Sequence, residues 1–203
     1  TRTPLQLNLT AFKGTIVPHA TIAADGRFTL DTNNGSEHCT FNIPEDVYVQ
    51  NSGKTFRIGK LTGKGSLGGF CSFRNGVTAQ TNTWQVGNDK DFKFEGIVTS
   101  NDNFTKVGTG EMTVTGAWTS TGAINISAGG IRLEAGGSLG TGALTVANSA
   151  SLTGVSDTKV ALTNSSITIN GTIQPGESAT ATSGNINFGG KNVTVNKNAK
   201  III

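Results

Sequence analysis

From residue 104 to the end, the chain repeats short segments in which apolar and small polar residues alternate, separated by Gly, Asn or Ser. Strict alternation is the period of a β-strand, because successive side chains point to opposite faces. Two or three such segments make a unit of roughly 20 residues, a length typical of repeat architectures. The expected strands are Glu111–Thr115, Ala123–Ser127, Gly130–Glu134, Ala143–Val146, Ser151–Thr153, Lys159–Leu162, Ser166–Ile169, Asn185–Phe188, Asn192–Val195 and Ile201–Ile203.

One unit of this kind cannot bury its apolar face alone. Coiling the chain so that equivalent strands stack in parallel gives one continuous core, and each turn then satisfies the hydrogen bonds of its neighbours. Gly at the corners permits backbone angles that other residues adopt only with strain. No segment has the apolar spacing of a long helix, which excludes helical crossovers of the βαβ kind. We therefore predict an all-β fold, a parallel β-solenoid.

Residues 1–103 differ in composition from residues 104–203, and we treat them as two regions. Nine of the ten Phe residues lie at or before Phe104, together with both Cys and both His. The first region is either a set of wider, aromatic-filled turns of the same solenoid or a separate β-sandwich cap, which would shield an open end. We favour the first, because Leu61–Gly68 is similar to the later Gly-rich strand entries. Its expected strands are Leu5–Leu9, Thr21–Ala23, Arg27–Leu30, Cys39–Ile43, Val47–Val49, Thr55–Ile58, Gly69–Phe73, Trp84–Val86 and Phe92–Ile97.

Composition limits the function classes. With 203 residues, 35% of them hydrophobic and 14% charged, the chain is apolar enough for a folded core and is not typical of a disordered protein. The net charge is +3, yet the 16 Lys and Arg are scattered singly. We therefore expect no nucleic-acid partner and no membrane surface, and leave open a weak preference for acidic glycans. No apolar stretch is long enough to span a membrane as a helix. The start at Thr1 without a signal peptide favours a mature or excised piece of something larger.

The stretch Phe104–Ala117 resembles the autotransporter-associated β-strand repeat of bacterial passenger domains, in which a threonine-lysine pair precedes a Gly-x-Gly step and an alternating strand. Thr121–Leu133 is similar to the second half of that repeat, and Gly136–Val146 is a partial further copy. The resemblance covers about residues 94 to 154. The family usually carries Asn-Thr-Tyr after the Gly-Ala step, where this chain has Trp118-Thr119-Ser120, so we expect a differently built corner there.

The resemblance implies a right-handed parallel β-helix displayed outside the cell or at the outer-membrane surface of a Gram-negative bacterium. We accordingly expect a secreted structural or adhesin-like module without a cofactor, whose partners are host or bacterial glycans or surface proteins. One alternative is a carbohydrate-active β-helix, a polysaccharide lyase or hydrolase or a non-catalytic part of one. Another is a stalk that binds nothing.

Few residues point to catalysis. Adjacent residues of a strand face opposite ways, so His38 and Cys39 are not expected to form a nucleophile and base pair. Asp89 and Asp91 share a face, but they follow Gly87-Asn88 and fit a polar turn better than a carboxylate pair or a calcium loop. We expect no enzymatic activity and no metal site.

Three aromatic residues and two cysteines remain as candidates. Tyr48, Trp84 and Trp118 would stack on sugar rings if they are exposed, and buried packing is the alternative. Cys39 and Cys71 lie 32 residues apart and form either a disulfide, in an oxidising compartment, or two buried free thiols.

Overall fold

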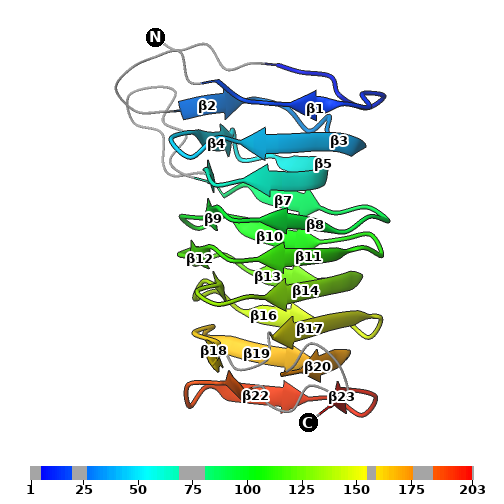
Figure 1. The fold of residues 1–203 in the computed structure, drawn as a ribbon, viewed down its shortest axis with the longest axis vertical. Helices are drawn as coiled ribbons and strands as arrows, with labels where there is room; N and C mark the ends of the chain where they lie inside the picture. Colours follow the sequence, from blue (N-terminus) through cyan, green and yellow to red (C-terminus); the bar gives the residue numbers. More distant parts are fainter. Residues whose placement is uncertain (1–5, 20–26, 69–80, 155–158, 176–184, 203) are drawn as a thin grey trace.

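A computed structural model of the chain describes residues 6–19, 27–68, 81–154, 159–175 and 185–202. These residues form a parallel β-solenoid, in which the turns stack from the N-terminal end to the C-terminal end (Figure 1). Every strand pairing is parallel, for example β10 with β13 and β14 with β17. The predicted fold is confirmed. Within the described ranges no helix is long and apolar enough to cross a membrane.

Two long sheets make two faces of the solenoid. The first is nine-stranded, with one strand from each successive turn. Its strands are β1 (Thr15–Ile16), β3 (Ser36–Ile43), β5 (Thr55–Gly63), β7 (Thr83–Val86), β10 (Asn103–Lys106), β13 (Ile124–Ile126), β16 (Leu144–Val146), β19 (Ser166–Ile169) and β22 (Asn192–Val195). The second is six-stranded: β8 (Phe92–Phe94), β11 (Glu111–Val114), β14 (Gly129–Leu133), β17 (Ala150–Gly154), β20 (Thr172–Gln174) and β23 (Lys200–Ile201).

Shorter strands make the third face. Four of them form one sheet: β2 (Arg27–Leu30), β4 (Tyr48–Asn51), β6 (Ser66–Leu67) and β9 (Ile97–Val98). Two pairs follow it: β12 (Ala117–Trp118) with β15 (Ser138–Leu139), and β18 (Lys159–Ala161) with β21 (Asn185–Asn187). A full turn therefore passes from this third face to the nine-stranded sheet and on to the six-stranded sheet.

The strand register places apolar residues of successive turns directly beside one another in the interior. Trp84, Phe104, Ile124 and Leu144 pair in one column of the nine-stranded sheet at 20-residue steps, and all four are buried. Ring contacts continue the column toward the N-terminus, where Phe56 packs edge-on against Trp84 with centroids 6.3 Å apart. Period-two alternation thus places the apolar residues inside and their polar neighbours outside.

The same sheet runs through both regions of the sequence, because β7 pairs with β10 across position 103 in unbroken register. Several strands have bounds that alternation does not predict. Ala117–Trp118 and Ser138–Leu139 are too short to carry a periodic signal, and residues 6–9 of the expected strand Leu5–Leu9 are not in a strand. The expected strands Thr21–Ala23 and Gly69–Phe73 lie outside the described residues.

A buried polar spine, defined here as Asn51, Asn82, Asp102, Ser120 and Asn164, follows the corner that leads into the nine-stranded sheet; all five residues are fully buried. The Asn82 side chain and backbone N–H both donate to the Asp102 carboxylate at 3.0 Å. Ser120 Oγ donates to the backbone oxygen of Asp102 at 2.6 Å. Asn82, Asp102 and Ser120 on neighbouring turns therefore satisfy one another's corner groups. Asn164 donates through Nδ2 to the backbone oxygens of Leu139 and Gly142, and its Oδ1 is buried without a hydrogen-bond partner among the described residues.

Candidate functional site

The two predicted tryptophans are not binding platforms. Trp84 is fully buried, and its indole N–H donates to Asp102 Oδ2 at 2.7 Å. Trp118 is 3% exposed and packs against Phe104 with ring centroids 4.7 Å apart. The expected sugar-stacking role therefore fails for both residues, because each occupies an inward position in its strand. The corner after Ala117 is built around this inward ring.

Tyr48 differs from the tryptophans because it is 45% exposed, as the first residue of β4. It lies on the third face, beside Ser66 of β6. The aromatic candidates are therefore not brought together into one platform.

Cys39 is a buried free thiol whose Sγ lies 3.6 Å from the backbone oxygen of Thr40. Burial raises the pKa of the Cys39 thiol to about 11, which disfavours the reactive thiolate. His38 is exposed, on the other side of the strand. The pairing of Cys39 with Cys71 was expected as one alternative; Cys71 lies outside the described residues, and Cys39 has the free-thiol form.

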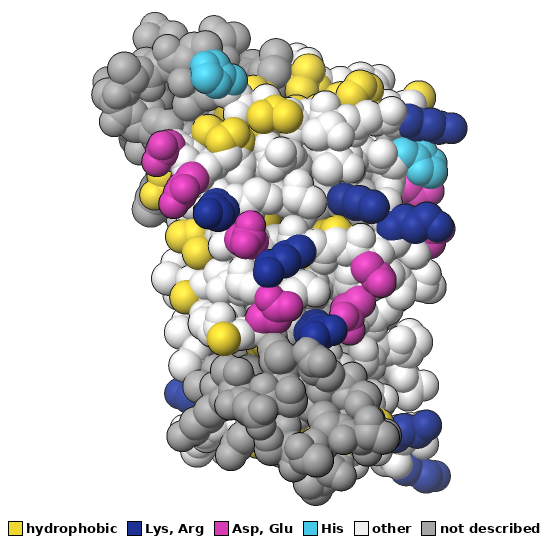
Figure 2. All heavy atoms as spheres, in the orientation of Figure 1, with side chains coloured by type: hydrophobic (Ala, Val, Ile, Leu, Met, Phe, Trp, Pro, Cys, Tyr) yellow, Lys and Arg dark blue, Asp and Glu magenta, His cyan; other side chains and the backbone are white. Residues whose placement is uncertain are grey.

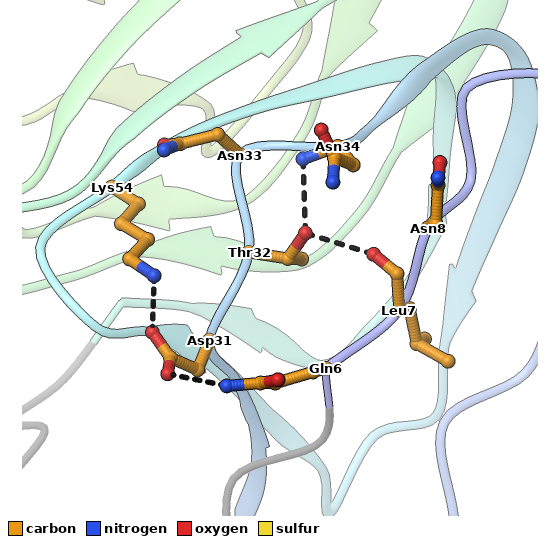
Figure 3. Close-up of a pocket in the computed structure, with 8 residues that line it drawn as sticks. All are labelled: Gln6, Leu7, Asn8, Asp31, Thr32, Asn33, Asn34 and Lys54. Atoms are coloured by element: carbon orange, nitrogen blue, oxygen red, sulfur yellow. Dashed lines mark hydrogen bonds and ion pairs between the residues drawn. The ribbon is translucent and has the colours of Figure 1, made fainter.

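A polar pocket lies near the N-terminal turns and has a volume of about 420 Å³ (Figure 3). It joins three segments of the chain: residues 6–8, the four residues that follow β2, and Lys54, which follows β4. The lining residues are Gln6, Leu7, Asn8, Asp31, Thr32, Asn33, Asn34 and Lys54. The site is therefore assembled by the stacking of turns.

An ion pair lies at one side of this pocket. Lys54 Nζ is 2.6 Å from Asp31 Oδ1, and Gln6 Nε2 donates to Asp31 Oδ2 at 3.3 Å. The hydrogen bond from Lys54 is the main cause of a lowered pKa for the Asp31 carboxyl. The carboxylate is thus ionised at neutral pH and held between two donors.

Backbone contacts fix the other side. Thr32 is buried, and its Oγ1 donates to the backbone oxygen of Leu7 at 2.8 Å and accepts from the Asn34 backbone N–H at 2.9 Å. Asn33 Oδ1 accepts from the backbone N–H of Thr55 at 3.2 Å. These bonds tie the loop after β2 to the turns on both sides of it, so the pocket is preformed.

Alternation does not predict the pocket, because its residues lie in loops. The signal that marks it is the run Asp31-Thr32-Asn33-Asn34-Gly35, a polar turn between two strands. Its binding groups come together only when neighbouring turns stack.

Lys106 is a second feature that alternation does not predict. It occupies an inward position of β10, between Val86 and Ile126, and is fully buried. Its Nζ donates to the backbone oxygens of Val107, Gly108 and Gly110 at 2.9, 3.1 and 2.6 Å. Burial lowers the pKa of Lys106 to about 8. The Lys before Gly-x-Gly thus closes the corner between the two long sheets.

The outer surface of the nine-stranded sheet carries a polar column, which we name the outer ladder. Its residues pair in register on consecutive strands, and from Gln85 to Thr168 they alternate with buried neighbours. The members are Gln85, Thr105, Asn125, Thr145, Thr168 and Thr194.

On the face drawn in Figure 2, Lys and Arg side chains are interspersed with Asp and Glu.

Asp89 and Asp91 lie in a turn before β8. Asp89 is paired with Lys90 at 3.1 Å, and Asp91 Oδ1 accepts from the Glu111 backbone N–H at 2.7 Å. In the part of the chain that the structure describes, no group of three or more His, Cys, Asp or Glu side chains is arranged to hold a metal ion.

Comparison of the chain with protein-family models, curated proteins and solved structures finds no match.

Proposed function

We propose that the chain is a structural and adhesin-like module that binds glycans at the surface of a Gram-negative bacterium or outside the cell. In this proposal the solenoid is a rigid scaffold, and its outer polar groups make the contacts. The resemblance of residues 94–154 to passenger-domain repeats supports the location.

The observation that carries the proposal is the outer ladder. Its hydroxyl and amide groups repeat at the strand spacing of about 4.8 Å along the solenoid. Thr105, Asn125 and Thr145 lie on three consecutive strands in exact pairing. A polymer with regularly repeated hydroxyl groups meets such a surface with many weak and equivalent contacts, which add through multivalency.

Among the described residues, two features fit a binding role better than catalysis. The thiol of Cys39 is buried with a raised pKa, and the carboxylate of Asp31 is held in an ion pair with a lowered pKa. General acid catalysis by a carboxyl group needs the opposite shift, a pKa near the working pH. The carboxyl of Asp102 has a raised pKa, but it is fully buried in the polar spine, where a polysaccharide does not reach it. The test below separates the carbohydrate-active alternative from binding.

Polysaccharide adhesion to the immobilised full chain tests the proposal. We expect retention of one or more neutral or acidic polysaccharides, and a weaker retention by the triple variant Thr105→Val, Thr145→Val, Thr168→Val. Valine keeps the branched shape of threonine and removes its hydroxyl. The matched control is the triple variant Thr113→Val, Thr153→Val, Thr172→Val on the six-stranded sheet.

Three outcomes contradict the proposal in different ways. If the wild-type chain retains no polysaccharide, the alternative of a stalk that binds nothing is favoured. Equal loss in both triple variants shows that the outer ladder has no special role. A fall in polymer length during incubation with the soluble chain identifies an enzyme.

A further inference from the structure

We propose that the pocket formed by Gln6, Asn8, Asp31, Asn34 and Lys54 binds one neutral hexose unit of a glycan. This inference rests on the proposed glycan-binding function and adds a specific site and ligand class to it. The outer ladder gives repeated weak contacts, whereas this pocket would select a sugar.

Size and position fit a single sugar ring. The volume of about 420 Å³ lies in the range of small-ligand pockets, roughly 300–1,000 Å³. The pocket lies at the corner where the third face meets the nine-stranded sheet, because its residues follow β2 and β4 and precede β3 and β5. A glycan chain lying across the solenoid reaches it without entering the core.

The charges in the pocket cancel. Asp31 and Lys54 form a contact of 2.6 Å, so the ionised pair carries no net charge. A carboxylate has about four acceptor positions and an ammonium has three protons. Asp31 accepts from Lys54, Gln6 and Ser52, and Lys54 donates to Asp31, so acceptor capacity remains on the carboxylate and protons remain on the ammonium for a ligand. Two neighbouring sugar hydroxyls match this pair, one donating to the carboxylate and one accepting from the ammonium.

The remaining lining groups are amides. Asn8 Oδ1 accepts from Thr10, which leaves the Asn8 N–H groups for a ligand. The Asn34 side chain is exposed, and its backbone N–H is the group bound to Thr32. An amide donates and accepts, as does a hydroxyl, whereas an anionic sugar would meet the Asp31 carboxylate and a cationic sugar the Lys54 ammonium.

Calorimetric titration of the full chain tests this site. The probes are glucose, galactose and mannose, with glucuronate and glucosamine as charged counterparts. We expect binding of at least one neutral hexose, weakened about tenfold by Asp31→Asn or Lys54→Met, the effect of losing one charge-assisted hydrogen bond. The matched controls are Glu134→Gln and Lys93→Met, which break an exposed ion pair of 3.0 Å on the six-stranded sheet and should leave hexose affinity unchanged.

A second variant guards against misfolding. Asn34→Leu keeps the backbone bonds of the loop and places an apolar branch at the pocket, so it should abolish hexose binding while circular dichroism stays unchanged. Tighter binding of glucuronate than of any neutral hexose overturns the proposed ligand class. Absence of hexose binding, or equal affinity in Asp31→Asn, Asn34→Leu and the wild type, overturns the site.

The polysaccharide retention assay separates this failure from failure of the proposed function. If Asp31→Asn still retains polysaccharide and the outer-ladder variant retains less, the adhesive module stands and the pocket is rejected. Loss of retention in the wild type rejects both.

Discussion

At the residue scale, Asp102 is a buried carboxylate held by neutral hydrogen-bond donors. Its three hydrogen-bonding groups are all donors: the backbone N–H and side-chain amide of Asn82 and the indole N–H of Trp84. Burial raises the pKa of Asp102, and these hydrogen bonds oppose that shift. Because every partner donates, only a group that accepts at both oxygens satisfies all of them.

We therefore predict that Asp102→Asn lowers the free energy of unfolding by about 1–3 kcal/mol, since the introduced N–H₂ faces another donor. Urea unfolding at pH 7 measures the change. Asp91→Asn is the control, because Asp91 is exposed and its carboxylate accepts from the Glu111 backbone N–H. A variant Asp102→Asn as stable as the wild type would show that Asp102 is protonated in the folded protein.

Lys106 links stability to pH. Below about pH 8 the lysine is protonated in both the folded and the unfolded chain; between about pH 8 and 10.5 the unfolded chain binds more protons. The Lys106 contribution to the free energy of unfolding therefore rises with pH across this window, by at most about 3 kcal/mol. The raised pKa of Cys39 acts in the opposite direction above pH 9.

Comparison with Lys106→Met removes the other titrating groups from the result. We predict that the stability of the wild type relative to Lys106→Met increases from pH 7 to pH 10, measured by chemical unfolding at each pH. Lys60→Met, on the outer side of β5, is the surface control. A constant difference for Lys106→Met would contradict the lowered pKa of Lys106.

The inward positions of Asp102 and Lys106 explain why sequence analysis found neither. Alternation assigns an inward position to an apolar side chain, and Lys106 interrupts the column Val86, Ile126, Val146. A charged residue there has a partner only once the corner after it folds back, which alternation does not describe. Trp84 was a candidate binding residue for the same reason. Alternation places its ring on one face of the strand, but it does not predict that the buried Asp102 carboxylate accepts from its indole N–H.

At the element scale, glycines let the corners stack. A Cβ at Gly116 would lie 1.8 Å from the backbone oxygen of Gly96, and one at Gly96 would lie 1.9 Å from the backbone oxygen of Gly65. Both distances are to backbone atoms of the neighbouring turn, which a side-chain movement cannot relieve. This column of glycines therefore fixes the spacing of turns where the six-stranded sheet gives way to the third face.

We predict that Gly116→Ala costs about 3 kcal/mol or more, in the range of severe substitutions, because two turns must separate. Gly190→Ala is the control: nothing lies within 4 Å of its Cβ position, and only its φ of 70° opposes the change, at about 1–2 kcal/mol. Thermal unfolding of both variants makes the comparison. Equal losses would show that backbone angle, and not close approach, governs these glycines.

Strands of four residues with strict alternation were predictable, as Ser166–Ile169 and Asn192–Val195 have the expected bounds. The third face was not, because strands of two residues such as Ala117–Trp118 hold too few positions for a period. The parallel stacking followed from the repeat itself. The pocket at Asp31 and Lys54 could not be predicted from the sequence, because it depends on which loops become neighbours after the turns stack.

At the scale of the whole molecule, each turn contacts mainly the turns before and after it, so stability is a sum over neighbouring pairs. The inner residues of the central turns are fully buried, as Ile126 and Val146 are. The last turn is different: β22 and β23 end their sheets, and Val195 and Ile201 are about half exposed, at 48% and 49%. The described chain should therefore be least stable at its C-terminal turn.

We predict a gradient in amide hydrogen exchange measured by mass spectrometry, slow in β10 and β13 and fast in β22, because a terminal strand opens without disturbing the others. Two core variants test the neighbour rule. Ile169→Ala, which pairs with Val146 and Val195, should lower protection in β19 and β22 alone. Ile126→Ala leaves a cavity at a central turn and should lower protection from β10 to β22, since the shorter C-terminal stack loses its support. Equal loss across all strands in both variants would instead require one cooperative unit, in which a single turn cannot open on its own.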